Sequence, residues 1–194
     1  HDLKNPLNGI LGVAQILMQE GWPKEREELV RMVYDSGMQI LNMVDNMFDY
    51  LRMEDGTYRL QPERFDLGSF VRTLCSEFSH TFDAEKIGLD CRINGQPLAQ
   101  AAEGDHFFTG ERMQLKTVFS NLLRNAFEAS GEGDTVRLDV EIDDTLRARI
   151  HNPAPVPREV RDSFFERYVT HGKERGNGLG TYIARHITEY HGGS

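Results

Sequence analysis

The chain has 194 residues, of which 39% are hydrophobic and 27% are charged, so it can bury a core as one ordinary domain or as two small ones. Its formal net charge of -9 argues against nucleic acid as a partner, because a phosphate backbone repels an acidic surface. The sequence has no visible signal peptide, and no apolar run approaches the roughly 20 residues that span a bilayer.

Residues 1–57 are predicted to form a helical hairpin. Apolar residues recur at helical spacing from Leu7 to Met18, and Gly21-Trp22-Pro23 breaks the pattern. The second helix has an apolar seam that alternates steps of four and three residues, which is typical of bundles. Two helices cannot bury both of their seams, so we expect half of a dimeric four-helix bundle. The seam of the second helix comprises Leu29, Val33, Ser36, Ile40, Met43, Met47 and Leu51.

A predicted linker over residues 58–65 leads into an α+β domain over residues 66–194. Asp66 can cap the first helix of this domain, whose apolar residues recur on one face. Alternation of apolar and polar residues predicts the strands, the last two of which form a hairpin. The predicted strands cover residues 89–93, 107–108, 136–142 and 146–150, a loop covers 95–105, and further helices cover 111–129, 159–168 and 180–190.

Cys75 and Cys91 are the only cysteines, and neither belongs to a CxxC pair or a Cys/His cluster. We therefore expect two buried free thiols in a reducing cytosol rather than a disulfide or a zinc site. Because the chain begins at His1 rather than at a methionine, we expect it to be a piece of a longer protein, whose membrane anchor or sensor could lie elsewhere.

Three segments carry candidate chemistry. At the start, His1 is followed by Asp2, and a phosphoryl acceptor needs a neutral imidazole whose proton an adjacent carboxylate can take. Asn5 lies one helical turn further on and could position a water or the ring. Taken without context, a histidine beside an aspartate is also what a solvated surface pair looks like.

The second segment is a helix face. Asn121, Asn125 and Glu128 fall at i, i+4 and i+7, so they share one face of the predicted helix. Amide and carboxylate oxygens are ligands that magnesium prefers, and Arg124 could reach a phosphate. An ordinary polar face of an amphipathic helix is the alternative.

The third segment is rich in glycine. Gly176, Gly178 and Gly180 precede a predicted helix, where glycines permit close approach of the backbone to phosphates, and Thr181 lies in the first turn. The basic stretch over residues 170–175 before them suggests a mobile lid. A flexible turn without a ligand is the alternative.

Together and in this order, these motifs resemble the transmitter core of two-component sensor histidine kinases. Residues 1–7 resemble the phosphoacceptor motif, 121–126 the N-box, 164–168 the phenylalanine motif and 176–180 the second glycine motif, while His191-Gly192-Gly193 resembles the end of the last helix. The resemblance covers essentially the whole chain. It implies a dimerisation and phosphotransfer hairpin, followed by an α/β-sandwich ATP-binding domain of the Bergerat type, the gyrase/Hsp90/kinase/MutL (GHKL) superfamily.

The resemblance implies ATP-dependent autophosphorylation on His1, with Asp2 as base, and transfer to an aspartate of a response regulator. Asn5 matches the position that helps to dephosphorylate partner receivers. ATP and Mg²⁺ are the implied cofactors, with Asn125 as the metal ligand and Asn121 beside it. A homodimer in the bacterial cytoplasm is implied, with membrane contact only through a segment absent from this chain. The other implied nucleotide-binding residues are Arg124, His151, Asn152, Arg167, Lys173, Gly176, Gly178, Leu179, Gly180 and Thr181.

The chain departs from the family at the first glycine motif, where residues 151–157 contain neither the adenine-binding aspartate nor a glycine. Ungapped alignment puts His151 in the place of the aspartate. Strand parity favours Asn152, because Leu146, Ala148 and Ile150 are expected to face the core. A neutral amide binds adenine more weakly than a carboxylate. The alternative function is therefore a degenerate transmitter that relays phosphate or acts as a scaffold without nucleotide binding.

Two further departures concern the catalytic domain, and a comparison with related ATPases bears on hydrolysis. Glu128 stands where many members place a basic residue. Asn121 stands where related ATPases place a water-activating glutamate, so hydrolysis is disfavoured. The strands expected after Ser194 are missing, which would expose a sheet edge. The retained Asn125, lid and glycine segment favour a kinase over a scaffold.

Overall fold

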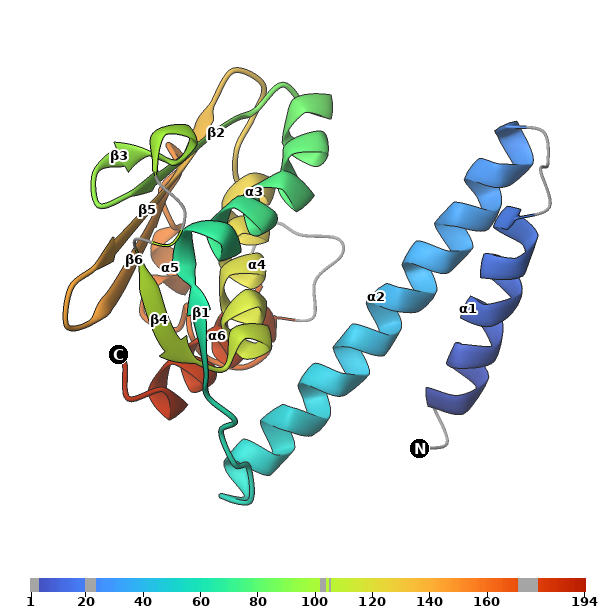
Figure 1. Ribbon diagram of the computed structural model, residues 1–194, viewed down its shortest axis with the longest axis horizontal. Coiled ribbons are helices and arrows are strands. Elements are labelled where there is room, and N and C mark those ends of the chain that lie inside the picture. Colours follow the sequence, from blue (N-terminus) through green and yellow to red (C-terminus); the bar gives the residue numbers. More distant parts are fainter. Residues whose placement is uncertain (1–3, 20–23, 102–103, 105, 171–177) are drawn as a thin grey trace. The chain divides into compact units, whose positions relative to one another are not determined.

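The computed structural model describes residues 4–19, 24–101, 104, 106–170 and 178–194 (Figure 1). The chain divides into two compact units, which we call the helical unit (His1–Tyr58) and the α/β unit (Arg59–Ser194). No helix in the described part of the chain is long and apolar enough to cross a membrane.

The helical unit is a hairpin of α1 (Lys4–Gln19) and α2 (Lys24–Glu54). Leu11 and Ala14 of α1 are buried. A Cβ added at Gly37 of α2 would lie 2.8 Å from Cδ2 of Leu11, so this glycine lets the two helices approach closely. The helical pattern in the sequence therefore predicted both helices, while the predicted break at residues 21–23 lies outside the described residues.

Much of the apolar surface of the hairpin faces away from the contact between its helices. Since each helix presents only one stripe to the other, the remaining apolar positions stay exposed. The exposed apolar members of the predicted seam of α2 are Leu29, Val33, Ile40, Met47 and Leu51. An apolar groove of about 510 Å³ is lined by Gly9, Ile10, Val13, Ala14, Leu17, Val30 and Val33.

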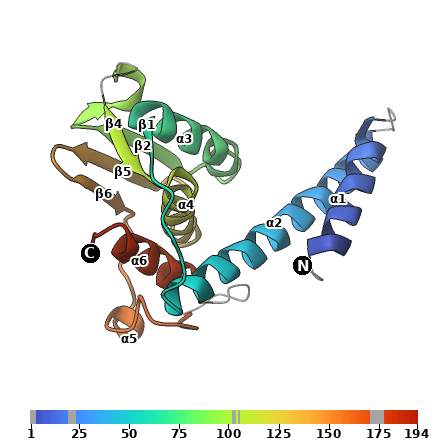
Figure 2. The same cartoon turned by 60° about the horizontal axis from the view of Figure 1, so that its bottom comes forward.

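The α/β unit has two layers, a mixed sheet and a layer of helices on one of its faces (Figure 2). The sheet comprises β2 (Gly88–Ile93), β3 (Gln96–Pro97), β5 (Thr135–Ile142) and β6 (Leu146–His151), and the helices are α3 (Leu67–Ala84), α4 (Arg112–Glu128) and α6 (Gly180–Tyr190). The strands lie in the order β3-β2-β5-β6, in which β2 and β5 are parallel and β5 and β6 form the predicted antiparallel hairpin.

The core lies between these layers. Val136, Leu138 and Val140 alternate along β5 and are almost completely buried against the helices. Full burial of such a side chain contributes about 1.5–3 kcal/mol. Asp66 caps α3, as predicted, because its side chain accepts a hydrogen bond from the backbone N–H of Ser69 at 2.5 Å. The periodic patterns thus identified the elements that carry the core.

Three local predictions were wrong. Residues Glu63–Phe65 of the predicted linker lie in β1 (Glu63–Asp66), which pairs with β4 (Phe107–Gly110). The predicted loop over residues 95–105 contains β3 and a 3₁₀ helix (Leu98–Gln100). The predicted helix over residues 159–168 shrinks to α5 (Arg158–Arg161). Beyond Arg161 the chain continues in turns, and the N–H of Tyr168, which has φ of +63°, donates to the carbonyl of Gly178.

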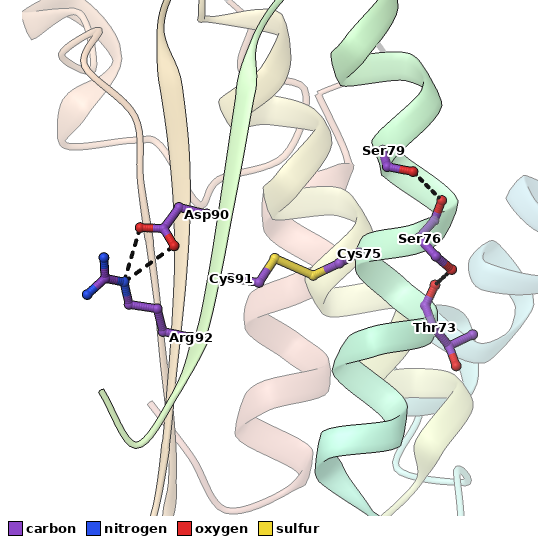
Figure 3. The surroundings of a disulfide bond; sticks show 7 residues. All are labelled: Thr73, Cys75, Ser76, Ser79, Asp90, Cys91 and Arg92. Atoms are coloured by element: carbon purple, nitrogen blue, oxygen red, sulfur yellow. Dashed lines mark hydrogen bonds and ion pairs between the residues drawn. A yellow bond between two sulfur atoms is a disulfide. The ribbon is translucent and has the colours of Figure 1, made fainter. Parts of the chain in front are cut away.

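The cysteines were also predicted wrongly. Cys75 of α3 and Cys91 of β2 form a disulfide, and both residues are only half-buried. Figure 3 shows the bond between helix and strand, with Asp90 and Arg92 on the opposite side of β2. The pairing arises because α3 packs over β2, which no local spacing of cysteines reveals.

Candidate functional site

The candidate site is built on α4, whose two faces differ sharply. Asn121 and Asn125 lie one turn apart and are half-buried, whereas Leu123 and Ala126 are buried in the core. Their carboxamides therefore sit at the border between the core and solvent. Glu128, also predicted for this face, and Arg124, predicted to reach a phosphate, are both exposed.

Helix α6 packs beside α4 and brings the glycine segment to the asparagines. A Cβ added at Gly180 would lie 3.4 Å from Oδ1 of Asn121, so the start of α6 passes directly over this amide. The two motifs are far apart in the sequence, and their contact unites two predicted parts of one site. Because Gly180 has no side chain, it leaves space for the carboxamide of Asn121.

The chain enters α6 through Gly178 and Leu179. Gly178 has φ of +63°, which favours glycine, and Leu179 is the N-cap of α6 but makes no side-chain capping bond. Thr181 is only 7% exposed. A residue so deeply buried has little surface to offer a ligand, whereas the N–H groups of a helix start favour an anion.

An aromatic contact joins the predicted phenylalanine motif to α6. The guanidinium of Arg167 lies 4.9 Å from the ring centroid of Tyr182, and that ring packs against His186. Arg167 was predicted to contact phosphate, and here its cation rests on an aromatic face. Sequence reasoning missed Tyr182, although a tyrosine in the first turn of a helix after a glycine segment could have been noted as a candidate.

The two alternatives for adenine recognition lie at the end of β6. His151 is exposed and Asn152 is half-buried, as strand parity predicted, although Ala148 is exposed rather than inward-facing. The Asn152 side-chain nitrogen donates to the carbonyl of Ala154 at 3.1 Å. This bond orients the carboxamide and leaves its oxygen as the group suited to accept from a ligand.

Several predicted residues cannot be placed. His1, Asp2, Lys173 and Gly176 lie outside the described residues, and Asn5 is described only as part of the backbone of α1. Among the described residues, no group of three or more His, Cys, Asp or Glu could hold a metal ion. The predicted metal donors that the structure describes, Asn121 and Asn125, offer amide oxygens, which are hard ligands suited to magnesium.

Away from the site, the outer face of the sheet carries paired charges. The Arg149 guanidinium donates to the Glu141 carboxylate at 2.7 Å and lowers the pKa of that carboxyl below 4.5. The backbone and hydroxyl of Thr145 donate to Asp143 and lower its pKa below 3.8. The ion pairs Arg149–Glu141 and Arg147–Asp143 thus bring opposite charges together here.

Family models match most of the chain. Residues 1–56 match the His Kinase A (phospho-acceptor) domain, and residues 110–194 match the histidine kinase-, DNA gyrase B-, and HSP90-like ATPase. The sensor protein EvgS of Escherichia coli O157:H7 is 28% identical over 96% of this chain and 16% of its own length. The aerobic respiration control sensor protein ArcB of Escherichia coli K12 is 26% identical over 100% of this chain and 25% of its own length. The chain thus spans a quarter or less of these relatives.

Solved structures share the fold. The catalytic domain of the histidine kinase ThkA superposes with a TM-score of 0.57 and 26% identity, over 67% of this chain and 81% of that one. Full-length ShkA in complex with AMPPNP gives a TM-score of 0.71 at 22% identity, over 100% of this chain and 40% of that one. ThkA in complex with the response regulator protein TrrA gives 0.58 at 22% identity, over 100% and 53%. The predicted fold class is confirmed.

Proposed function

The chain belongs to the sensor histidine kinases of two-component systems as a transmitter core, and from this premise we propose that it is an ATP-dependent protein-histidine kinase. It would phosphorylate His1 and pass the phosphoryl group to an aspartate of a response regulator. The observation that carries the proposal is the contact between Gly180 and Asn121, because it joins the glycine segment to the amide face of α4.

The nucleotide would bind over α4 and the start of α6. Asn125 would hold Mg²⁺, with Asn121 beside it, since both half-buried amides offer hard oxygen donors. When bound, the metal would neutralise phosphate charge. The exposed Arg124 would add a cation, and Asn152 would accept from the adenine amino group.

The phosphoryl acceptor would be His1. Its neutral imidazole nitrogen would form the bond to the γ-phosphorus while the bond from that phosphorus to the leaving oxygen of ADP breaks, and Asp2 would take the imidazole proton. Asn5 would help to position water when the receiver is dephosphorylated. These roles rest on the match of residues 1–56 to the phospho-acceptor domain.

The helical unit would bind the protein partners. Its exposed apolar seam suits a second copy of the chain, giving a dimeric four-helix bundle. A receiver domain would be the acceptor of the phosphoryl group, as the complex of the related ThkA with a response regulator supports. Such a protein would work in the cytoplasm, with the membrane reached only through other segments.

The test is whether the folded chain binds nucleotide in the presence of magnesium, which a calorimetric titration with Mg-ATP measures. We expect Asn125→Ala to abolish binding and Gln100→Ala, which removes an exposed amide elsewhere in the α/β unit, to leave it unchanged. Incubation with ATP labelled at the γ-phosphate should then place an acid-labile label on the chain, and His1→Gln should remove it. A folded chain that binds no nucleotide at millimolar concentration would instead support the degenerate relay or scaffold, since the adenine-binding aspartate is missing.

A further inference from the structure

One histidine joins the end of α6 to the start of α4. His191 follows α6 directly, and its Nε2 accepts a hydrogen bond from the backbone N–H of Glu111 at 3.1 Å. Its Nδ1 lies 2.8 Å from the carbonyl oxygen of Ile187 in the last turn of α6. Glu111 is the N-cap residue of α4 and makes no capping bond with its own side chain.

Both bonds require one form of the imidazole. Nδ1 must carry the proton to donate to Ile187, and Nε2 must keep its lone pair to accept from Glu111. Helix starts leave N–H groups without partners, and the N–H of Glu111 at the start of α4 finds one in Nε2. On the other side of the ring, the carbonyl of Ile187 accepts from Nδ1 as well as from the backbone N–H of His191. The ring is held in place by the tight turn that follows, in which Gly192 has φ of +78° and Gly193 donates to Thr188 at 2.9 Å.

The position of this bond along the helices gives it its significance. Asn121 lies ten residues after Glu111 on α4, and Gly180 lies eleven residues before His191 on α6. At 1.5 Å per residue, the contact of Gly180 with Asn121 and the bond of His191 with Glu111 lie about 15 Å apart, one at each end of α6. The two helices therefore run antiparallel with a contact at each end.

We propose that His191 is a positioning residue, which fixes the register of α6 against α4 and thereby seats Gly180 on Asn121. Apolar contacts such as those of the buried Ala184 and Ile187 resist separation of the helices, but they fix the position of α6 along α4 less strictly. A hydrogen bond is directional, so the bond from Glu111 to His191 fixes that position. The proposal rests on the proposed function, since it concerns how the proposed nucleotide site is assembled.

Two amide substitutions separate the two bonds of the ring. The amide of glutamine reaches the position of Nε2, so His191→Gln can still accept from Glu111. The amide of asparagine reaches only the position of Nδ1, so His191→Asn can still donate to Ile187 but loses the bond to α4. His191→Ala removes both. The asparagine and glutamine variants thus distinguish a cap of α6 from a link between the helices.

We expect the dissociation constant of Mg-ATP to rise about fivefold to tenfold in His191→Ala and His191→Asn, and to stay within about threefold of the parent in His191→Gln. These affinities should be measured well below the melting temperature of each variant, so that every variant is folded. Equal affinity in all variants, or rescue by asparagine and not by glutamine, would overturn the proposal and leave His191 as a local cap.

A second measurement does not depend on nucleotide. In NMR spectra of the free chain, the Cβ protons of Asn121 should show a cross-relaxation peak to the Cα protons of Gly180 in the parent and in His191→Gln. The peak should weaken in His191→Ala and His191→Asn. If the parent binds no nucleotide but the peak follows this pattern, the proposed function fails and the positioning role stands. A peak unchanged in all variants overturns the positioning role.

Discussion

Gly178 packs directly on the backbone of Tyr168. The N–H of Tyr168 donates to the carbonyl of Gly178 at 3.0 Å, and a Cβ added at Gly178 would lie only 2.5 Å from the carbonyl carbon of Tyr168. This contact joins the two ends of the segment that leads into α6. Because the obstacle is backbone rather than a flexible side chain, it cannot move aside cheaply.

Gly178→Ala is therefore expected to disrupt the start of α6. The substitution adds a clash with Tyr168 to the cost of about 1 kcal/mol for a left-handed backbone at an L-residue. Mg-ATP affinity and the melting temperature should both fall. Gly133→Ala is the matched control, since Gly133 has φ of +88° with nothing within 4 Å of an added Cβ. Equal effects of the two substitutions would show that the contact with Tyr168 is unimportant.

The sequence predicted those elements whose side chains repeat regularly. The apolar faces of α3 and α4 and the alternation along β5 and β6 each identified their element to within a few residues, because burial itself imposes the period. The same patterns selected Asn121 and Asn125, which share a polar face simply by being one turn apart.

Contacts between distant segments were missed. The bond from Glu111 to His191 joins residues 80 positions apart, and no local pattern encodes it. The disulfide of Cys75 and Cys91 depends on α3 packing over β2, so a search for closely spaced cysteines could not find it. The helix predicted over residues 159–168 ends at Arg161, and the bond from Tyr168 to Gly178 beyond it also joins residues that no local pattern connects.

The exposed seam of α2 should hold a dimer together. Ile40 is 52% exposed, so Ile40→Asp should cost little within one chain but should place a charge in the apolar interface of the expected bundle. Sedimentation velocity should show the parent as a dimer and the variant as a monomer. Met113→Asp, at a position 68% exposed in the α/β unit, controls for the added charge and should stay dimeric. A parent that is monomeric at high concentration would contradict the expected bundle.

Acid should reduce the contribution of the charged side chains on the sheet to the free energy of unfolding. The pKa of Glu141 lies below its ordinary value of 4.5, chiefly because of the hydrogen bond from Arg149, so the folded state binds this proton more weakly than the unfolded state. Its stabilising contribution is therefore present above pH 4.5 and is lost as the pH falls through the lowered pKa. Asp143 behaves in the same way below 3.8.

Arg149→Gln isolates this effect from the other carboxyl groups that titrate in acid. The difference in free energy of unfolding between parent and variant should be present at neutral pH and should shrink as the pH falls below about 4. Both side chains are exposed, so the difference should be small and should diminish further in about 1 M salt. A difference that grows in acid would contradict the assignment.

The disulfide between Cys75 and Cys91 should stabilise the α/β unit when the chain is oxidised. The bond closes a loop across a sequence separation of 16, and cross-linking such a loop restricts the unfolded chain. The expected gain is about 3 kcal/mol in the free energy of unfolding. Denaturant unfolding with and without dithiothreitol measures this gain, and a Cys75→Ala/Cys91→Ala variant should unfold alike in both conditions.

Thiol titration of the denatured chain, prepared without reductant, should find no free thiol, whereas two free thiols per chain would contradict the bond. Since a reducing cytosol would open this disulfide, the protein in its proposed location should show the stability of the reduced form.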